Sequence, residues 1–192
     1  FIGNYSSGKM GYAIAQEMIN RGYAVDLISG PSVLAIPEGL QSFTKVTSAE
    51  QMYNESMAIS AHADICIMAA AVADYTPNKV ATSKIKKSDQ DLEIQLSKTK
   101  DILASIGANK RENQVIVGFA LETHDAHFRA ITKMQKKACD MMVVNGPAAI
   151  DSTDNRVKIL DLSGEVIQEL QGKKTKIAKS ILAEIEQRLI KS

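Results

Sequence analysis

Short, uninterrupted apolar runs that alternate with helical patterns constrain the fold of this 192-residue chain more than any other feature. The runs are Ile65–Ala71, Val115–Phe119 and Met141–Val144. An apolar run without alternation is typical of a parallel strand that is covered on both faces of its sheet. A helical pattern precedes each run, so the order along the chain is helix, strand, helix, strand. We therefore predict an α/β fold with a Rossmann-like, doubly wound, mostly parallel sheet and helices on both faces.

Local signals place the other elements. Met10, Ile14 and Met18 recur at helical spacing, and this helix should end near Gly22. Thr47-x-x-Glu50 has the form of a capping box that opens a helix. Further strands are expected at 24–28, 43–46 and 92–96, helices at 47–62, 101–109, 126–137 and 177–189, and a β-hairpin extension from 156–160 and 166–170 around a turn at 162–165.

Length and charge limit the classes of protein that this chain can belong to. A length of 192 residues suits a single domain, 1–192, with a full hydrophobic core. The net charge of +1 gives no electrostatic argument for nucleic acid or for an acidic membrane surface. No apolar run approaches the roughly 20 residues that a membrane span needs. Cys66 and Cys139 lie in apolar surroundings and are expected to be reduced and buried, which predicts a cytoplasmic protein.

The loops that follow the predicted strands are the expected binding region, because ligands of such folds lie at the carboxyl ends of the strands. Four of these loops, 29–31, 72–75, 120–123 and 145–146, are small or polar. The segment Asn4–Gly11 enters a helix, whose first backbone N–H groups and positive dipole end favour phosphate or carboxylate. The Lys-rich stretch 76–90 has the composition of a mobile flap.

Three short patterns resemble known motifs and each lacks an essential part. Gly3-x-x-x-x-Gly8-Lys9 continues with Met10, where a P-loop needs a hydroxyl for magnesium. Tyr75-x-x-x-Lys79 has the spacing of a short-chain dehydrogenase pair, but Pro77 disfavours the helix that such a pair requires. His124-x-x-His127 has no cluster of Cys or carboxylates around it, so a metal site is not expected there.

Four motifs taken together are more specific. Asn4–Gly11, Ala69–Tyr75, Lys84–Lys87 and Gly118–Thr123 occur in this order, and the pattern continues through 133, 137 and 145 to 154–155. In this respect nearly the whole chain resembles phosphopantothenate–cysteine ligase, also called phosphopantothenoylcysteine synthetase, of the bacterial type. In that family a first strand and a glycine-bearing loop precede the Asn4 segment. The chain starts at Phe1, so the resemblance implies that this strand and loop are missing from it.

The resemblance implies a ligase of coenzyme A biosynthesis that joins 4′-phosphopantothenate to L-cysteine. Bacterial members use CTP with Mg²⁺ and pass through an acyl-cytidylate, which the cysteine amine then attacks with release of CMP. Many bacterial members are fused behind a flavin-dependent decarboxylase, and family members form homodimers. The alternating segment Leu92–Leu96 follows the flap directly, which would set the flap beside a partner subunit.

Site residues are carried over from the family position by position. An amide at Asn4 donates to an acyl oxygen without offering a competing nucleophile, and a lysine at Lys84 neutralises nucleotide phosphate. The resemblance implies Asn4 and Lys84 as catalytic residues, Asp74, Lys84, Phe119, Lys133 and Lys137 as nucleotide-binding residues, Asn4, Ala70, Ala71 and Asn145 as substrate-binding residues, and no protein ligand to a metal.

Two other functions stay open at this stage. One is an NAD(P)-dependent oxidoreductase of the short-chain type, and the other is a nucleotide-binding module without catalysis. Release of CMP and pyrophosphate from CTP, phosphopantothenate and cysteine would identify a ligase. A change in NADPH absorbance would identify an oxidoreductase, and binding without turnover would identify a module.

Overall fold

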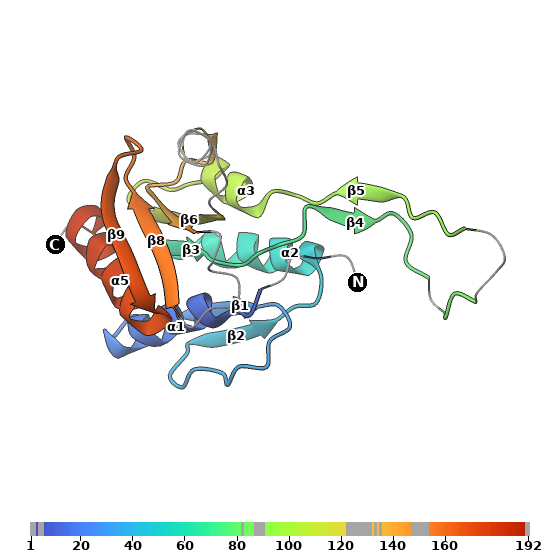
Figure 1. The fold of residues 1–192 in the computed structure, drawn as a ribbon, viewed down its shortest axis with the longest axis horizontal. Coiled ribbons are helices and arrows are strands. Elements are labelled where there is room, and N and C mark those ends of the chain that lie inside the picture. Colours follow the sequence, from blue (N-terminus) through green and yellow to red (C-terminus); the bar gives the residue numbers. More distant parts are fainter. Residues whose placement is uncertain are drawn as a thin grey trace.

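A five-stranded sheet forms the centre of the molecule (Figure 1). The computed structural model describes residues 3, 6–81, 83–86, 91–121, 132, 134, 136–146 and 154–190. The strand order is β3 (Ile65–Met68), β6 (Val115–Leu121), β7 (Met141–Asn145), β8 (Asp154–Leu160) and β9 (Val166–Lys173). β3, β6 and β7 run parallel, and β8 and β9 are added as an antiparallel hairpin at one edge. The predicted α/β class, with its β-hairpin extension, is confirmed.

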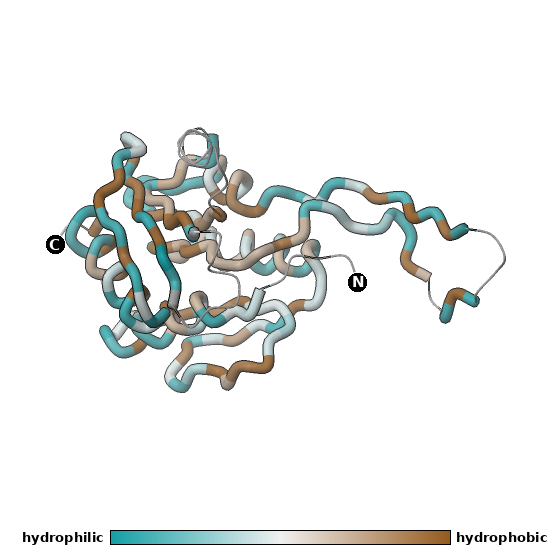
Figure 2. Tube along the Cα trace, in the orientation of Figure 1, coloured by the Kyte–Doolittle hydropathy of each residue, from teal (hydrophilic) through white to brown (hydrophobic). Residues whose placement is uncertain are grey.

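Helices cover both faces of this sheet. On one face, α1 (Lys9–Asn20) and α5 (Lys174–Leu189) pack on Val117, Val143 and Ile159. On the other face, α2 (Ala49–Ser60) and α3 (Ile102–Ala108) pack on Ile116 and Met142. The predicted apolar face of α5 is confirmed, because Ile177, Ile181 and Ile185 are all buried. Figure 2 shows the corresponding apolar segments gathered in the central strands.

A smaller parallel sheet lies beside the main one. It consists of β1 (Asp26–Ser29) and β2 (Ser42–Lys45), and neither strand pairs with β3. The predicted central, doubly covered strand at Ile65–Ala71 is therefore wrong in two respects. β3 ends at Met68, and it is an edge strand of which only Cys66 is buried, because in the described chain no strand pairs with its other edge.

The cap of α2 also differs from the prediction. Ser48, not Thr47, is the N-cap residue, and its Oγ accepts from the backbone N–H of Gln51 at 3.1 Å. Gln51 Oε1 in turn accepts from the backbone N–H of Thr47 at 2.8 Å. The cap thus lies one residue further along the chain. The side chain of Gln51, and not that of Glu50, accepts the hydrogen bond from the loop before the helix.

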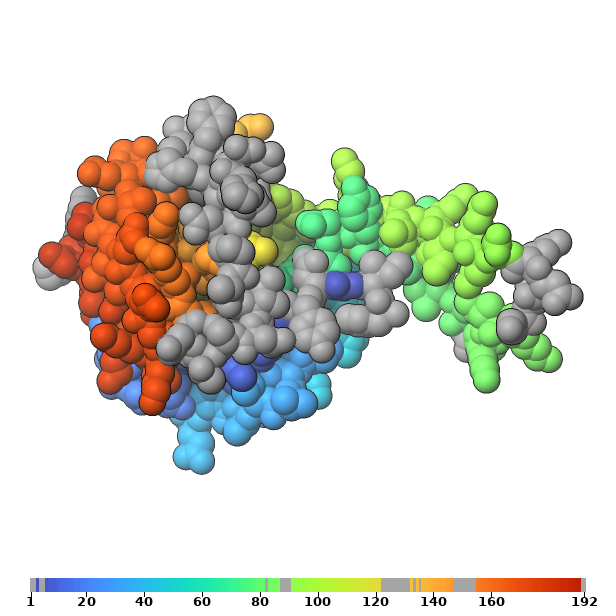
Figure 3. Space-filling view, viewed as in Figure 1, coloured from blue at the N-terminus to red at the C-terminus, as the bar shows by residue number. Residues whose placement is uncertain are grey.

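An extended arm projects from the body between β3 and α3 (Figure 3). Its base is a short antiparallel pair, β4 (Tyr75–Pro77) and β5 (Leu96–Lys98). The predicted strand at Leu92–Leu96 with one covered face is wrong, since Leu92 is 63% exposed, Ile94 is 55% exposed, and only Leu96 belongs to β5. Most of the predicted helix at 126–137 lies outside the described residues.

No helix in the described part of the chain is long and apolar enough to cross a bilayer.

Candidate functional site

The first turn of α1 lies against the loops that follow β1 and β3. Gly8 adopts the left-handed region with φ 71°, and a Cβ atom there would lie 3.6 Å from Ser32 Oγ. A Cβ atom at Gly11 would lie 3.8 Å from the Cβ of Ala69, the first residue after β3. These approaches place the start of α1 at the carboxyl ends of two strands, which is where ligands bind in open α/β sheets.

The charge of this helix start favours an anion. The first turn of α1 contains no acidic residue and begins with Lys9, and no side chain in the described part of the chain caps the helix. Its first backbone N–H groups therefore have no partner within the helix, and the helix dipole adds positive potential at the same point. A phosphate or carboxylate would satisfy both the hydrogen bonding and the charge of this turn.

A hydrogen bond joins α1 to the end of β1 beside this turn. The Tyr12 hydroxyl lies 3.0 Å from Ser29 Oγ, and Ser29 is only 7% exposed. Because Ser29 Oγ donates to the carbonyl of Gly30 at 2.9 Å, Tyr12 is the donor to Ser29. The pair holds the loop after β1 against α1. Sequence reasoning missed it because the two residues come from separate elements.

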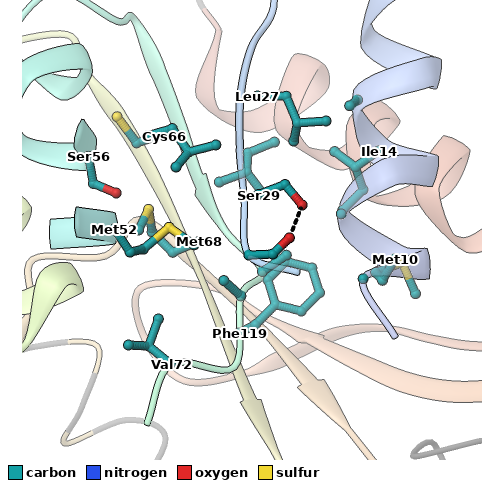
Figure 4. A pocket seen from close by; sticks show the side chains of 18 of the residues that line it. Met10, Ile14, Leu27, Ser29, Met52, Ser56, Cys66, Met68, Val72 and Phe119 are labelled. Carbon is teal, nitrogen blue, oxygen red and sulfur yellow. Dashed lines mark hydrogen bonds between the residues drawn. The ribbon is translucent and has the colours of Figure 1, made fainter. Parts of the chain in front are cut away.

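A large cavity of about 1690 Å³ opens along this edge and continues between β1 and β3. Its walls are mostly apolar, and Figure 4 shows Met10, Phe119 and Val72 around one part of it, with Met52, Cys66 and Met68 further in. Phe119 is half-buried on β6, and both Phe119 and Met10 pack against the buried cluster that contains Ile14 and Val117. An aromatic face at the rim suits the stacking of a nucleotide base.

The structure brings four of the predicted site residues together. Ala70, Ala71, Phe119 and Asn145 all line this cavity, together with the first turn of α1. Asn155, to which sequence reasoning assigned no role, lines it as well. A signal for Asn155 existed in the polar Asp154-Asn155 start of a strand. Its position just beyond the end of β7 follows only from strand pairing.

The other predicted residues lie elsewhere or outside the described chain. Asp74 is exposed and does not line the cavity, although Ala73 beside it does. Lys84 is exposed on the arm. The ammonium of Lys137 lies 2.8 Å from the carboxylate of Asp101. Asn4, Lys133 and the pair His124 and His127 fall outside the described residues.

The described side chains contain no group of three or more His, Cys, Asp or Glu residues that could hold a metal ion. Burial raises the pKa of the Cys139 thiol to about 11 and also raises that of Cys66. Both cysteines are buried and free, and thiols with raised pKa values are poor nucleophiles and poor metal ligands. We therefore assign neither cysteine to the chemistry of the site.

The chain is similar to known proteins over nearly its whole length. Residues 1–189 match the family described as DNA/pantothenate metabolism flavoprotein C-terminal domain. The chain is 39% identical over 189 residues to the coenzyme A biosynthesis bifunctional protein CoaBC of Bacillus subtilis (strain 168), covering 88% of this chain and 46% of that protein. It is 38% identical over 189 residues to a cysteine/cysteine sulfinic acid decarboxylase of an unknown prokaryotic organism, covering 96% of this chain and 53% of that protein.

A solved structure shows the same fold. The crystal structure of the C-terminal domain of a coenzyme A biosynthesis bifunctional protein CoaBC superposes with a TM-score of 0.80 at 36% identity. The match covers 97% of this chain and 85% of that one. The chain spans about half the length of the curated relatives it matches.

Proposed function

The chain belongs to the DNA/pantothenate metabolism flavoprotein C-terminal domain family, and on this basis we propose that it is a CTP-dependent phosphopantothenate–cysteine ligase. It would join 4′-phosphopantothenate to L-cysteine in coenzyme A biosynthesis. The likeness to CoaBC of Bacillus subtilis and to the solved C-terminal domain of a CoaBC protein supports this proposal. The reduced state expected for the two buried cysteines is consistent with a cytoplasmic location.

The observation that carries the proposal is the position of the α1 start. Uncapped N–H groups and Lys9 meet the loop after β3 and the aromatic ring of Phe119 at one cavity. The substrates of this reaction carry phosphate and carboxylate groups, which repel one another in water. A site that supplies fixed positive potential is needed to bring them together.

The chemistry proceeds in two steps. A carboxylate oxygen of phosphopantothenate attacks the α-phosphorus of CTP, and the bond to the β-phosphate breaks with release of pyrophosphate. The cysteine amine then attacks the acyl carbon, CMP leaves, and the nitrogen loses one proton to water. In this proposal the first turn of α1 holds phosphate, Phe119 contacts the base, and Asn4 donates to the acyl oxygen.

Mg²⁺ is proposed to arrive with the nucleotide. Protein sites for Mg²⁺ in phosphoryl transfer commonly use few carboxylates and rely on the substrate phosphates. When bound, the ion would neutralise charge on the triphosphate.

The oxidoreductase alternative is not supported. Tyr75 lies on strand β4 and is exposed, so Tyr75 and Lys79 do not share a helix face as the catalytic pair of a short-chain dehydrogenase would. The family match gives no support to it either.

The cavity between β1 and β3 supports the prediction of a further strand, while the glycine-bearing loop stays a prediction. Every residue of β1 (Asp26–Ser29) and of β3 (Ile65–Met68) lines the cavity, so backbone edges as well as side chains border it. β1 and β3 have no partner on these edges in the described chain. A parallel strand between them would join the two sheets and cover apolar residues such as Leu27 and Ile67.

A homodimer is the proposed assembly. Val80, Ile85, Leu92 and Ile94 are 81%, 60%, 63% and 55% exposed, so the arm presents apolar side chains along its length (Figure 2). Exposed apolar groups of this density commonly mark contact surfaces. Lys84 lies on the same arm, so a partner seated there would border the flap, which remains a prediction for segment 76–90.

One assay tests the proposal. The purified protein is incubated with phosphopantothenate, cysteine and Mg²⁺, and with CTP, ATP or NADPH in separate reactions. Pyrophosphate and CMP that form only when phosphopantothenate is present support the ligase. Oxidation of NADPH, or nucleotide binding without any pyrophosphate, would refute it.

A further inference from the structure

Two asparagine side chains at the carboxyl edge of the main sheet carry oxygen atoms without a hydrogen bond. Asn145 ends β7 and Asn155 is the second residue of β8. Both Oδ1 atoms are buried, and neither has a donor in the described part of the chain. Asn155 is only 3% exposed. Such an atom has lost its hydrogen bonds to water and gained none in return, which proteins rarely tolerate without a function.

The strand register places both side chains on one face. Asn145 is paired with Val157 across the antiparallel strands, so these two side chains point to the same side. Asn155 precedes Val157 by two residues and therefore points to that side as well. Diagonal neighbours of this kind lie about 7 Å apart at their α-carbons, so one small group can contact both side chains.

This face is the one that α1 covers. Val143 and Val157 belong to the same buried cluster as Ile14 of α1, and Phe119 packs against that cluster. Asn145 and Asn155 line the cavity together with the first turn of α1. The two asparagine residues therefore border the region where the proposed function places its substrates.

The charges at this edge favour a neutral donor. The charged cavity residues near the carboxyl edge are Lys9 and Lys174, the first residues of α1 and α5. The acidic cavity residues, Asp26 and Asp64, belong to the amino ends of β1 and β3 at the opposite edge. At an edge whose cavity lining carries these two lysines, amide oxygens suit an uncharged N–H group better than an ammonium.

We propose that Asn145 Oδ1 and Asn155 Oδ1 together accept the two hydrogens of one neutral primary amino group of a substrate. The proposal rests on the proposed function, which supplies two such groups, the amine of L-cysteine and the exocyclic amine of the cytosine base. A hydroxyl or a secondary amide offers one hydrogen and leaves one oxygen unpaired. Held in this way, the cysteine amine keeps its lone pair for the acyl carbon.

The test uses Asn145→Leu and Asn155→Leu, which remove the oxygen at nearly constant volume. If the group is the cysteine amine, the KM for cysteine rises about tenfold or more, as loss of a buried hydrogen bond implies. Pyrophosphate release without cysteine then keeps its rate. If the group is the cytosine amine, the KM for CTP rises instead, and the preference for CTP over UTP falls.

The melting temperature of the ligand-free protein gives an independent readout. Both variants should melt at the same temperature as the parent or higher, because each loses an unpaired buried acceptor. Gln168→Leu is the matched control, since Gln168 Oε1 is also buried and unpaired but does not line the cavity. It should share the stability gain and leave every KM unchanged.

Two results would overturn the proposal. One is an unchanged KM for both cysteine and CTP in an active Asn155→Leu protein. The other is a lower melting temperature with unchanged kinetics, which would mean a structural role. A parent protein without ligase activity would refute the proposed function instead. The amino-group proposal is then judged by whether cysteine or CTP raises the melting temperature of the parent and not of the variants, and it fails if neither does so.

Discussion

The ammonium of Lys137 lies 2.8 Å from the carboxylate of Asp101, and the same carboxylate caps α3 by accepting from the N–H of Ala104 at 3.0 Å. Lys137 is predicted to contact nucleotide, so the Asp101 carboxylate competes with a nucleotide phosphate for the Lys137 ammonium. The side chain of Lys137 is 22% exposed and that of Asp101 is 52% exposed, so water screens the pair. A nucleotide phosphate would therefore displace Asp101 at a small cost.

Lys137→Gln should weaken nucleotide binding with little loss of stability. We expect the KM for CTP to rise about tenfold, since a charged hydrogen bond to phosphate is lost. The free energy of unfolding should fall by about 1 kcal/mol or less. Lys110→Gln is the control, because Lys110 pairs with Asp140 at 2.5 Å with a similar side-chain exposure of 24%. Equal effects of both changes on the KM would contradict a nucleotide contact at Lys137.

Gly107→Ala should destabilise the protein. A Cβ atom at residue 107 would overlap the backbone carbonyl of Lys137, and backbone cannot rotate away as a side chain can. We expect the free energy of unfolding to fall by about 3 kcal/mol. A larger loss would leave too little soluble protein for the measurement. Gly30→Ala tests the general cost of losing a glycine, because no atom lies within 4 Å of its Cβ position and its φ is not in the left-handed region. Denaturant unfolding of both variants gives the comparison, and an unaffected Gly107→Ala protein would refute this close approach.

Cys139 should make stability fall at alkaline pH. Burial raises the pKa of its thiol to about 11 from an ordinary value of 9.0. Between these values the unfolded chain binds fewer protons than the native chain, so the free energy of unfolding decreases as pH rises, by at most about 1.4 kcal/mol per pH unit. Cys139→Ala should show a smaller decrease over this range. Parallel stability curves of parent and variant from about pH 8 to about pH 11 would rule out the raised pKa.

A charge on the arm should separate the proposed dimer. Leu92→Glu with Ile94→Glu places carboxylates where the interface would bury apolar side chains, which is costly. Sedimentation should give about twice the chain mass of 20.8 kDa for the parent and the single mass for the variant. Leu162→Glu, at a residue 60% exposed in the turn after β8, should leave the dimer intact. A parent that sediments as a fully active monomer would refute the dimer.

Asn4→Asp should cripple the second half-reaction. The new carboxylate repels the anionic intermediate and removes the amide donor, which at an oxyanion site is worth roughly 3–4 kcal/mol, or about 10²–10³ in rate. Quenched-flow measurement of product formation after pyrophosphate release isolates this step. Asn20→Asp, on the last turn of α1, controls for a carboxylate on the same segment. Turnover of Asn4→Asp within a few-fold of the parent would disprove the role.

Local sequence patterns were sufficient to predict those elements whose conformation and buried face depend on the spacing of their own apolar residues. Val115–Phe119 and Met141–Val144 became the buried strands β6 and β7, and Ile177, Ile181 and Ile185 became the buried stripe of α5. In each case the spacing of apolar side chains sets both the backbone period and the side that loses contact with water. Four residues selected from the motif order line one cavity, because parallel strands bring their carboxyl ends to one edge, and their roles stay predictions; they are Ala70, Ala71, Phe119 and Asn145.

Only the tertiary structure decided which strands have neighbours and which side chains meet. Ile65–Met68 is as apolar as β6, yet it is an edge strand, because pairing depends on another segment and not on the residues of the strand itself. The shared face of Asn145 and Asn155 arises from the register of β7 with β8, and the Lys137–Asp101 pair from the approach of α3 at Gly107. These contacts join residues that are distant in sequence. Each contact depends on how two segments pack together, so no local sequence pattern predicts it.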